Sequence, residues 1–204
     1  QRCQHPVSVV TKSALVERDL DILSDMAAKG LASVTISVTT FDRELSRRME
    51  PRAAAPNRRL ATIRTLAEAG IPVGVLVAPV VPVLTDSEIE VILETVAEAG
   101  ATSADYVLLR LPHEVEGLFR EWLDAHYPLK ADHVMSRLAE AREGRANDPE
   151  VGTRMTGTGN FAEMIGRRFD LARRRLGLTG NELTLASDRF VPPPAPSGTQ
   201  LDLL

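Results

Sequence analysis

The sequence predicts an α/β fold in which parallel strands alternate with helices. Three observations support it: short apolar runs rich in β-branched residues, an amphipathic segment after each of the first three runs, and a glycine at the end of each such segment. Because the runs are apolar on both faces, we expect strands buried inside a parallel sheet. The four runs are Val7–Thr11, Val34–Val38, Val73–Ala78 and Tyr106–Leu111.

The segments between the runs have helical periodicity. They cover Val16–Lys29, Asn57–Ala69 and Ser87–Ala99. A glycine follows each of them, where a left-handed C-cap costs glycine little. Strand–helix–strand repetition of this kind predicts right-handed βαβ units. Four strands in one direction fit either a barrel or an open doubly wound sheet, and periodicity does not choose between them.

Three more helices are predicted after the fourth run, over Glu114–Ala125, Ala131–Arg142 and Phe161–Leu176. The stretch 144–160 is rich in turn-forming residues, and the chain ends in a proline-rich segment. We therefore expect two parts. Residues 1–143 carry the strands, and residues 144–204 form a C-terminal extension with one helix and a proline-rich tail.

Composition excludes several classes of protein. With 204 residues, 44% of them hydrophobic, the chain can bury one substantial core, and a net charge of −4 gives no overall sign of a nucleic-acid-binding protein. The single cysteine, Cys3, excludes an intrachain disulfide and a cysteine-based zinc site, which fits a cytoplasmic protein. The four histidines lack metal-ligand spacing. No apolar run approaches the roughly 20 residues of a membrane helix, so we expect no membrane association.

Candidate site residues follow from the rule that parallel α/β folds bind ligands at the carboxyl ends of their strands. These ends, and the loop after the second run, offer a lysine, hydroxyls, a carboxylate and guanidinium groups. Such a set suits a zwitterionic ligand with a carboxylate, an amine and ribose hydroxyls. The candidates are Lys12, Ser37, Glu50, Arg52, Ala78, Pro79 and Arg110.

Each charged or polar candidate also has a simpler interpretation. Lys12 fits a solvated lysine at a strand end, and Arg52 fits an arginine paired with Glu50. The Ser37 hydroxyl fits a bond to the backbone. Arg110 is different, because an unpaired charge at a buried strand end is costly. It therefore needs a carboxylate or an anionic ligand.

Several segments together resemble a known family, over about residues 6–169. They are VTKS (10–13), TISVTT (35–40), MEPRAAAPNRRL (49–60), AGIPVGVLVAPVVP (69–82) and YVLLRLP (106–112). They are similar to the radical S-adenosylmethionine (SAM) proteins related to spore photoproduct lyase, the bacterial subgroup described as DNA-repair-photolyase-like. The resemblance implies a partial (β/α)6 TIM-like barrel with a helical C-terminal extension. It also implies a [4Fe–4S] cluster that reductively cleaves SAM, giving a radical that abstracts hydrogen from a substrate.

The resemblance also assigns residues. Lys12 and Ser37 match strand-end positions that contact SAM in the lyase, and Ala78 with Pro79 falls where a barrel strand passes the adenine. Glu50 matches a recurrent Glu-Pro pair. Arg52 stands where the lyase pattern has another residue, so its ligand role, like that of Arg110, rests on chemistry alone.

One departure from the family pattern is decisive. The family's CxxxCxxC loop, which supplies three cluster ligands, is absent from this sequence. We therefore expect a C-terminal fragment whose first two βα units lie upstream and which, by itself, neither holds the cluster nor cleaves SAM. We also expect it to self-associate through the sheet edge where those strands belong.

Two other functions fit the same residues. One is a small aldolase-like enzyme with Lys12 as a Schiff-base lysine. The other is a non-catalytic module that binds an adenosyl nucleotide. Nucleic acid is a further candidate partner, because arginines between positions 43 and 64 could meet phosphates.

Overall fold

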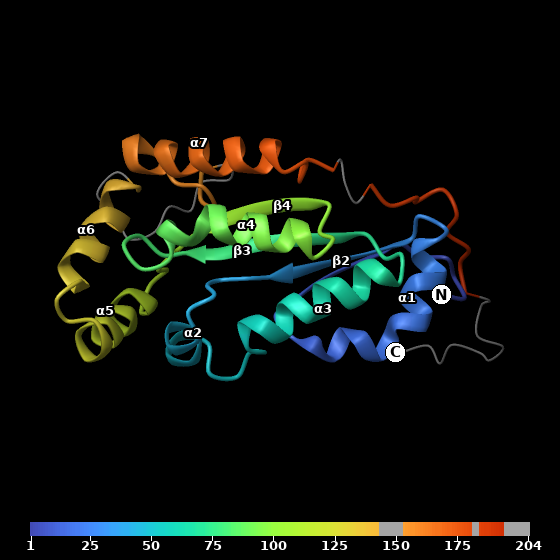
Figure 1. Cartoon of the computed structure of the whole chain (residues 1–204), viewed down its shortest axis with the longest axis horizontal. Helices are drawn as coiled ribbons and strands as arrows, with labels where there is room; N and C mark the ends of the chain where they lie inside the picture. The colour runs from blue at the N-terminus through green and yellow to red at the C-terminus, as the bar shows by residue number, and fades with distance from the viewer. Residues whose placement is uncertain (143–152, 181–183, 194–204) are drawn as a thin grey trace, which may run out of the picture.

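The computed structural model of this chain describes residues 1–142, 153–180 and 184–193. It contains one four-stranded sheet in the order β1-β2-β3-β4, in which every neighbouring pair is parallel (Figure 1). The strands are β1 (Val7–Thr11), β2 (Ala32–Ser37), β3 (Val73–Val80) and β4 (Ser103–Leu108). The predicted α/β fold of parallel strands is confirmed, and sequential strand order is the order that a barrel requires.

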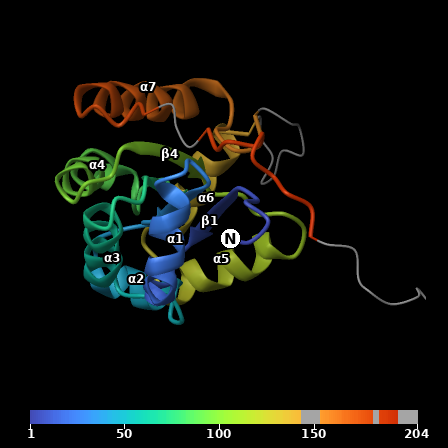
Figure 2. The same cartoon turned by 90° about the vertical axis from the view of Figure 1, so that its right-hand side faces the viewer.

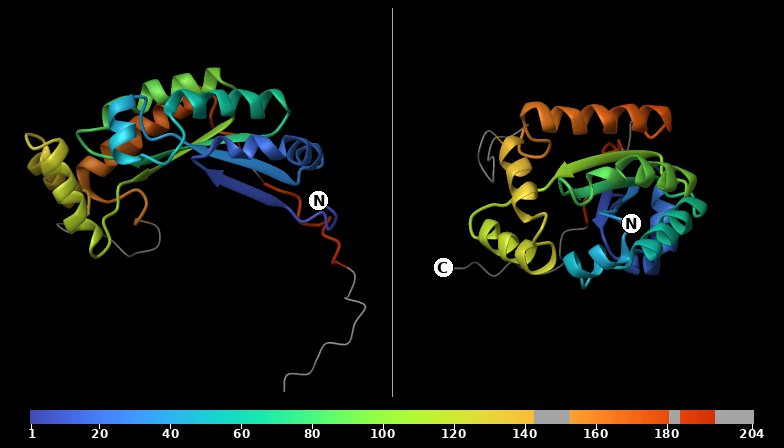
Figure 3. Two further views of the ribbon diagram at one scale, coloured as in Figure 1. Left: turned by 90° about the horizontal axis from the view of Figure 1, so that it is seen from below. Right: turned by 60° about the vertical axis from the view of Figure 1, so that its left-hand side comes forward.

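Helices cover one face of this sheet. Figures 2 and 3 show the helices α1, α3, α4 and α7 on that side, while the opposite face of β1 and β2 is open. The elements are η1 (Ala14–Asp19), α1 (Leu20–Ala27), α3 (Pro56–Glu68), η2 (Asp86–Glu88), α4 (Ile89–Glu98) and α7 (Gly159–Arg175), where η marks a 3-10 helix.

The core lies between the sheet and these helices. In α4, the four residues Ile89, Ile92, Leu93 and Val96 recur at helical spacing and are fully buried, so they form one apolar stripe against β3. From α7, the ring of Phe169 packs on Tyr106 of β4 with 4.8 Å between ring centroids.

A second group of helices lies at the carboxyl ends of the strands. These are α2 (Arg43–Met49), α5 (Val115–His126) and α6 (Ala131–Glu140), on the left of Figure 1. They share a smaller apolar cluster that includes Leu111 and Leu123. The indole Nε1 of Trp122 donates a hydrogen bond of 3.3 Å to the carbonyl oxygen of Arg48, so α5 holds the last turn of α2.

Several predicted elements need correction. The fourth strand is Ser103–Leu108 rather than Tyr106–Leu111, because Leu109 and Leu111 leave the sheet to pack in the smaller apolar cluster. The strands are not apolar on both faces. The face opposite the helices carries Thr35 and Gly74, which line an open cavity instead of a second helical layer. Helix α2 was not predicted, although Asp42 caps its start with hydrogen bonds from Glu44 N and Leu45 N.

Other expectations have mixed outcomes. The glycines Gly30, Gly70 and Gly100 follow helices with φ of 70°, 73° and 100°, as the predicted left-handed caps require. The division at residue 143, the stretch 144–152 and the tail from residue 194 lie outside the described residues, so the two-part organisation stays a prediction. Among the described helices, none combines the length and apolarity needed to cross a lipid bilayer.

Candidate functional site

The carboxyl ends of the first three strands meet at Lys12. This residue follows β1, and its Nζ donates to the carbonyl oxygen of Ala78 at 3.1 Å and to Thr39 Oγ1 at 3.3 Å. A third bond from Nζ goes to the Glu50 carboxylate, with which Lys12 forms an ion pair. Because side chains alternate along a strand, Lys12 continues the row of Val10, which faces away from the helices. The Lys12 ammonium therefore lies on the open face of the sheet.

Glu50 anchors this cluster from the end of α2. Its side chain is only 10% exposed and also accepts from Thr39 Oγ1 at 2.8 Å and from Arg59 Nη2 at 2.5 Å. Burial by itself would raise the pKa of the Glu50 carboxyl, but hydrogen bonds and charge from Lys12 and Arg59 hold that pKa below its ordinary value. Glu50 is thus held as a carboxylate between two cations.

Arg59 lies beneath the cluster with a side chain that is 2% exposed. Besides its bond to Glu50, Nε donates to the carbonyl oxygen of Ala54 at 2.7 Å and Nη1 donates to that of Ser37 at 3.0 Å. The guanidinium therefore ties α3, the loop after α2 and the end of β2 together. Each of its bonds is to a buried or half-buried acceptor, so the charge is compensated inside the protein.

Ser37, the last residue of β2, brings a hydroxyl to the same face. The residue is 5% exposed, and its side chain has no hydrogen-bond partner among the described residues. The expected bond from this hydroxyl to the backbone is therefore absent there. In β3, Ala78 contributes its carbonyl oxygen, and the Ala78–Pro79 peptide bond is cis.

The structure does not bring Arg52 and Arg110 into this cluster. Arg52 is exposed in the turn after Glu50 and makes no ion pair with a described residue. Arg110 lies two residues beyond β4, where Nη1 is 3.9 Å from Met155 Sδ and Nε is buried without a partner. No carboxylate of the described chain neutralises it. Ligand roles for these two residues stay predictions.

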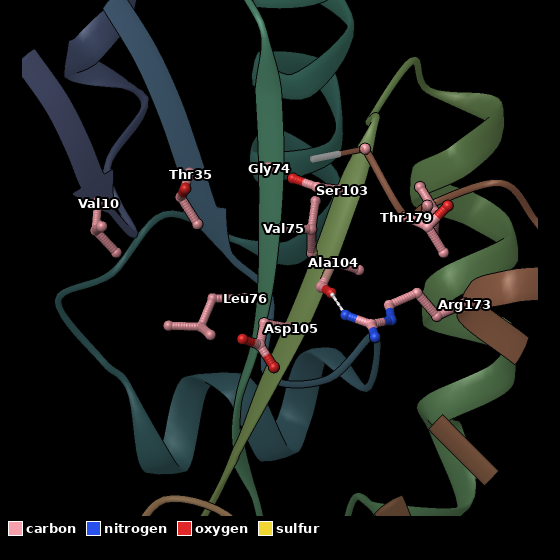
Figure 4. Close-up of a pocket in the computed structure, with 12 residues that line it drawn as sticks. Val10, Thr35, Gly74, Val75, Leu76, Ser103, Ala104, Asp105, Arg173 and Thr179 are labelled. Atoms are coloured by element: carbon pink, nitrogen blue, oxygen red, sulfur yellow. Dashed lines mark hydrogen bonds between the residues drawn. The ribbon is translucent and has the colours of Figure 1, made fainter. Parts of the chain in front are cut away.

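An open cavity of about 500 Å³ lies on the same face of the sheet (Figure 4). Thr35 of β2, Leu76 of β3 and Asp105 of β4 point into it. Arg173 of α7 donates to the carbonyl oxygen of Ala104 at 3.4 Å along its edge. The face opposite the helices is thus concave and lined by both polar and apolar side chains, and Val10 and Thr35 in its wall lie two residues before Lys12 and Ser37.

Two residues of the cluster, Thr39 and Arg59, were not among the predicted site residues. Arg59 had a signal in the sequence, because it shares a helical stripe with the buried Ile63 and Leu66. A charged side chain on an apolar stripe needs a buried partner. Thr39 extends the alternating row of Thr35 and Ser37 past the end of β2, which placed it on the open face.

A comparison with family models gives a match for the first part of the chain. Residues 2–96, from just before β1 to within α4, match the model of the radical SAM superfamily. The match covers 95 of the 204 residues, so slightly less than half of the chain is similar to the radical SAM superfamily. The side chains grouped around Lys12 lie within the matched residues.

Two uncharacterised relatives match part of the chain. An uncharacterised protein of Mycobacterium tuberculosis is 38% identical over 125 residues, which is 60% of this chain and 37% of the relative. An uncharacterised protein of Methanocaldococcus jannaschii is 26% identical over 136 residues, which is 67% of this chain and 49% of the relative. The chain therefore spans less than half the length of either.

The fold is that of spore photoproduct lyase. The lyase complexed with dinucleoside spore photoproduct matches 84% of this chain and 48% of its own length, with a TM-score of 0.56 and 18% sequence identity. This likeness confirms the predicted fold class, a partial TIM-like barrel of parallel strands.

The residues fit one superfamily cofactor and not the other. A [4Fe–4S] cluster needs three or four thiolates, and the sequence has one cysteine. In the part of the chain that the structure describes, no three His, Cys, Asp or Glu side chains are grouped to hold a metal. A site for SAM needs a cation near the SAM carboxylate and hydrogen-bond acceptors near its ammonium and hydroxyl groups. Lys12, Glu50 and the unbonded Ser37 hydroxyl supply those groups.

Proposed function

We propose that this chain forms the SAM-binding part of a radical SAM enzyme that abstracts hydrogen from its substrate. One observation carries the proposal: three adjacent parallel strands deliver Lys12, the Ser37 hydroxyl and the Ala78 carbonyl to one place, beside the buried carboxylate of Glu50. Active sites of such folds gather at this end of the sheet.

Each residue has a role in this proposal. The Lys12 ammonium exchanges one of its neutral acceptors for the SAM carboxylate, which is a stronger partner. Glu50 accepts from the SAM ammonium or a ribose hydroxyl, and Ser37 supplies a further hydrogen bond. Ala78 and Pro79 form the wall beside the adenine. Arg59 is a positioning residue, because it holds Glu50 without reaching the open face.

These 204 residues contain too few cysteines to bind the [4Fe–4S] cluster that would cleave SAM. The proposal therefore assigns its cysteines to sequence outside them, and the chain by itself binds SAM weakly and does not cleave it. An iron–sulfur enzyme of this kind belongs in the reducing cytoplasm.

Ligand-observed NMR with SAM tests the proposal, since the method detects weak binding. Wild type, K12M and S37A are compared with K29M, which removes an exposed lysine paired with Asp25. We expect K12M to weaken SAM binding about tenfold, the worth of one charge-assisted bond, and K29M to leave it unchanged. Equal binding by wild type and K12M, or no contact with SAM, would refute the assignment.

The two alternative functions give different results. Tight SAM binding by the isolated chain would favour the non-catalytic module. An aldolase-like enzyme needs a free amine at Lys12, whereas all three donors of this ammonium are engaged. Borohydride reduction in the presence of a carbonyl substrate would label Lys12 only if that alternative held.

A further inference from the structure

A second, smaller cavity lies on the other side of Glu50. Its volume is about 270 Å³, and it is bordered by α2 and by the segment that leads into α3. The side chains that the argument uses are Arg43, Ser46 and Arg47 of α2, with Ala55 and Pro56 at the start of α3. We call this cavity the α2 cavity. Lys12 and Ser37 do not line it, and Glu50 is the one residue that it shares with the SAM site proposed above.

Two unpaired cations face the α2 cavity. Arg43 and Arg47 lie one turn apart on the same face of α2, and neither forms an ion pair with a described residue. Their neighbour Arg48, on another face of the helix, is paired with Glu44. Like charges at this spacing destabilise an isolated helix, so the arrangement favours an anion between the two guanidinium groups.

A hydroxyl donor, Ser46, lines the cavity beside the two arginines. Ser46 is 5% exposed and lines the α2 cavity, yet its hydroxyl makes no hydrogen bond with the described residues. In the other helices, the hydroxyls of Thr62, Thr65 and Thr95 all donate to the carbonyl four residues earlier. Ser46 does not, so its hydroxyl is free to form a hydrogen bond with a ligand in the cavity.

The start of α3 adds a favourable dipole. This helix has 13 residues, Pro56 is its first residue, and Ala55 at the N-cap gives its first turn no side-chain hydrogen bond. An uncapped helix start that borders a cavity favours negative charge there. The one carboxylate in the wall, Glu50, is paired with both Lys12 and Arg59, so its repulsion of an anion is largely offset.

The walls of the α2 cavity are held in place before any ligand arrives. Trp122 of α5 bonds the carbonyl oxygen of Arg48, and Arg48 Nη1 donates back to the carbonyl oxygen of His126 at 3.4 Å. At the other end of α2, Asp42 accepts two backbone hydrogen bonds. A site fixed in this way loses little conformational entropy on binding.

We propose that the α2 cavity binds the phosphate group of a ligand that approaches the carboxyl end of the sheet. Two guanidinium groups, a hydroxyl without a hydrogen-bond partner among the described residues and a helix start match the charge and the several acceptor oxygens of a phosphate better than those of a single carboxylate. The phosphate comes from a small phosphorylated molecule or from a nucleic-acid backbone, which share this chemistry. The proposal does not depend on SAM binding.

Titration of the chain with inorganic phosphate, with thymidine monophosphate and with a short single-stranded oligodeoxynucleotide tests this site at fixed ionic strength. The variant R43Q/R47Q is compared with R64Q/R174Q, which removes two exposed arginines that have no ion pair with described residues and do not line the cavity. We expect at least tenfold weaker phosphate binding for R43Q/R47Q, several-fold weaker binding for S46A, and less than twofold change for the control.

The three ligands distinguish the sources of the phosphate. A loss in R43Q/R47Q that appears with inorganic phosphate and the monophosphate indicates a small ligand, and a loss seen only with the oligonucleotide indicates a nucleic acid. Equal losses in the two double variants would mean general charge attraction and overturn the proposal, as would no binding of any ligand by wild type. Far-UV circular dichroism and the thermal midpoint of each variant confirm that it is folded. No SAM is present, so failure here leaves the proposed function untouched.

Discussion

Replacing Glu50 by glutamine tests whether its negative charge holds the strand-end cluster together. The E50Q side chain keeps the size of the original but presents Arg59 and Lys12 with a neutral partner. Breaking a buried ion pair costs about 3–5 kcal/mol. Arg59 is 2% exposed, whereas Lys12 is 34% exposed and is partly stabilised by water. We therefore expect the free energy of unfolding to fall by about 2–4 kcal/mol.

Urea denaturation followed by circular dichroism measures this loss. For a slope of about 2–3 kcal/mol per molar urea, the midpoint of E50Q should fall by about 1 M. The matched control is E44Q, which removes an exposed carboxylate paired with Arg48 on the same helix. It should change the free energy of unfolding by no more than about 0.5 kcal/mol. If E50Q and E44Q have the same midpoint, the charge of Glu50 does not stabilise the cluster and the reasoning is wrong.

Four other changes have expected outcomes. The folded-state pKa of Glu50 is lowered, so the carboxylate contributes its full stabilisation above the ordinary pKa of 4.5 and loses it as the pH falls through the folded-state pKa. Below pH 4.5 in acid titrations, the free energy of unfolding of the wild type should therefore fall more steeply with pH than that of E50Q. R59M leaves Glu50 and two carbonyl oxygens without their buried donor and should cost about 3 kcal/mol in urea denaturation, while R59K should recover only part because lysine lacks the planar fork. G100A should destabilise the folded protein by about 2 kcal/mol, since φ is +100° and a Cβ would lie 2.7 Å from a side chain of a neighbouring helix. G117A in α5, which has open space around it, should stabilise the folded protein by about 0.5 kcal/mol, and thermal unfolding compares the two variants. Val10 of the outer strand β1 is 61% exposed, so V10K should reduce the predicted self-association in size-exclusion chromatography, and a wild type that elutes as a monomer would contradict that prediction.

The strands and most helices could be predicted because their signals are local. The run Val7–Thr11 is β1 without change of bounds, and Pro56–Glu68 differs from its prediction by one residue at each end. The fourth strand was misplaced because Leu109 and Leu111 are apolar for another reason, their packing against the helices at the strand ends. Periodicity measures burial and does not say which partner buries a residue.

The candidate site was predicted in part, for a similar reason. The rule about strand ends found Lys12 and Ala78, which share a hydrogen bond across β2. It did not find Arg59, which reaches the cluster from inside a helix, and the described contact of Arg110 is with Met155 and not with the cluster. The position of a residue relative to a predicted strand indicates at which end of the sheet it lies. The path of the loops determines which side chains it contacts.

Trp122 gives the protein an optical reporter in a useful place. It is the only tryptophan in the sequence, and its indole N–H is bonded to the backbone at the end of the helix that carries Arg43 and Arg47. A ligand that shifts this helix changes the polarity around the indole and hence the wavelength and intensity of its emission. Occupancy at the carboxyl end of the sheet can therefore be followed in solution without attaching any dye.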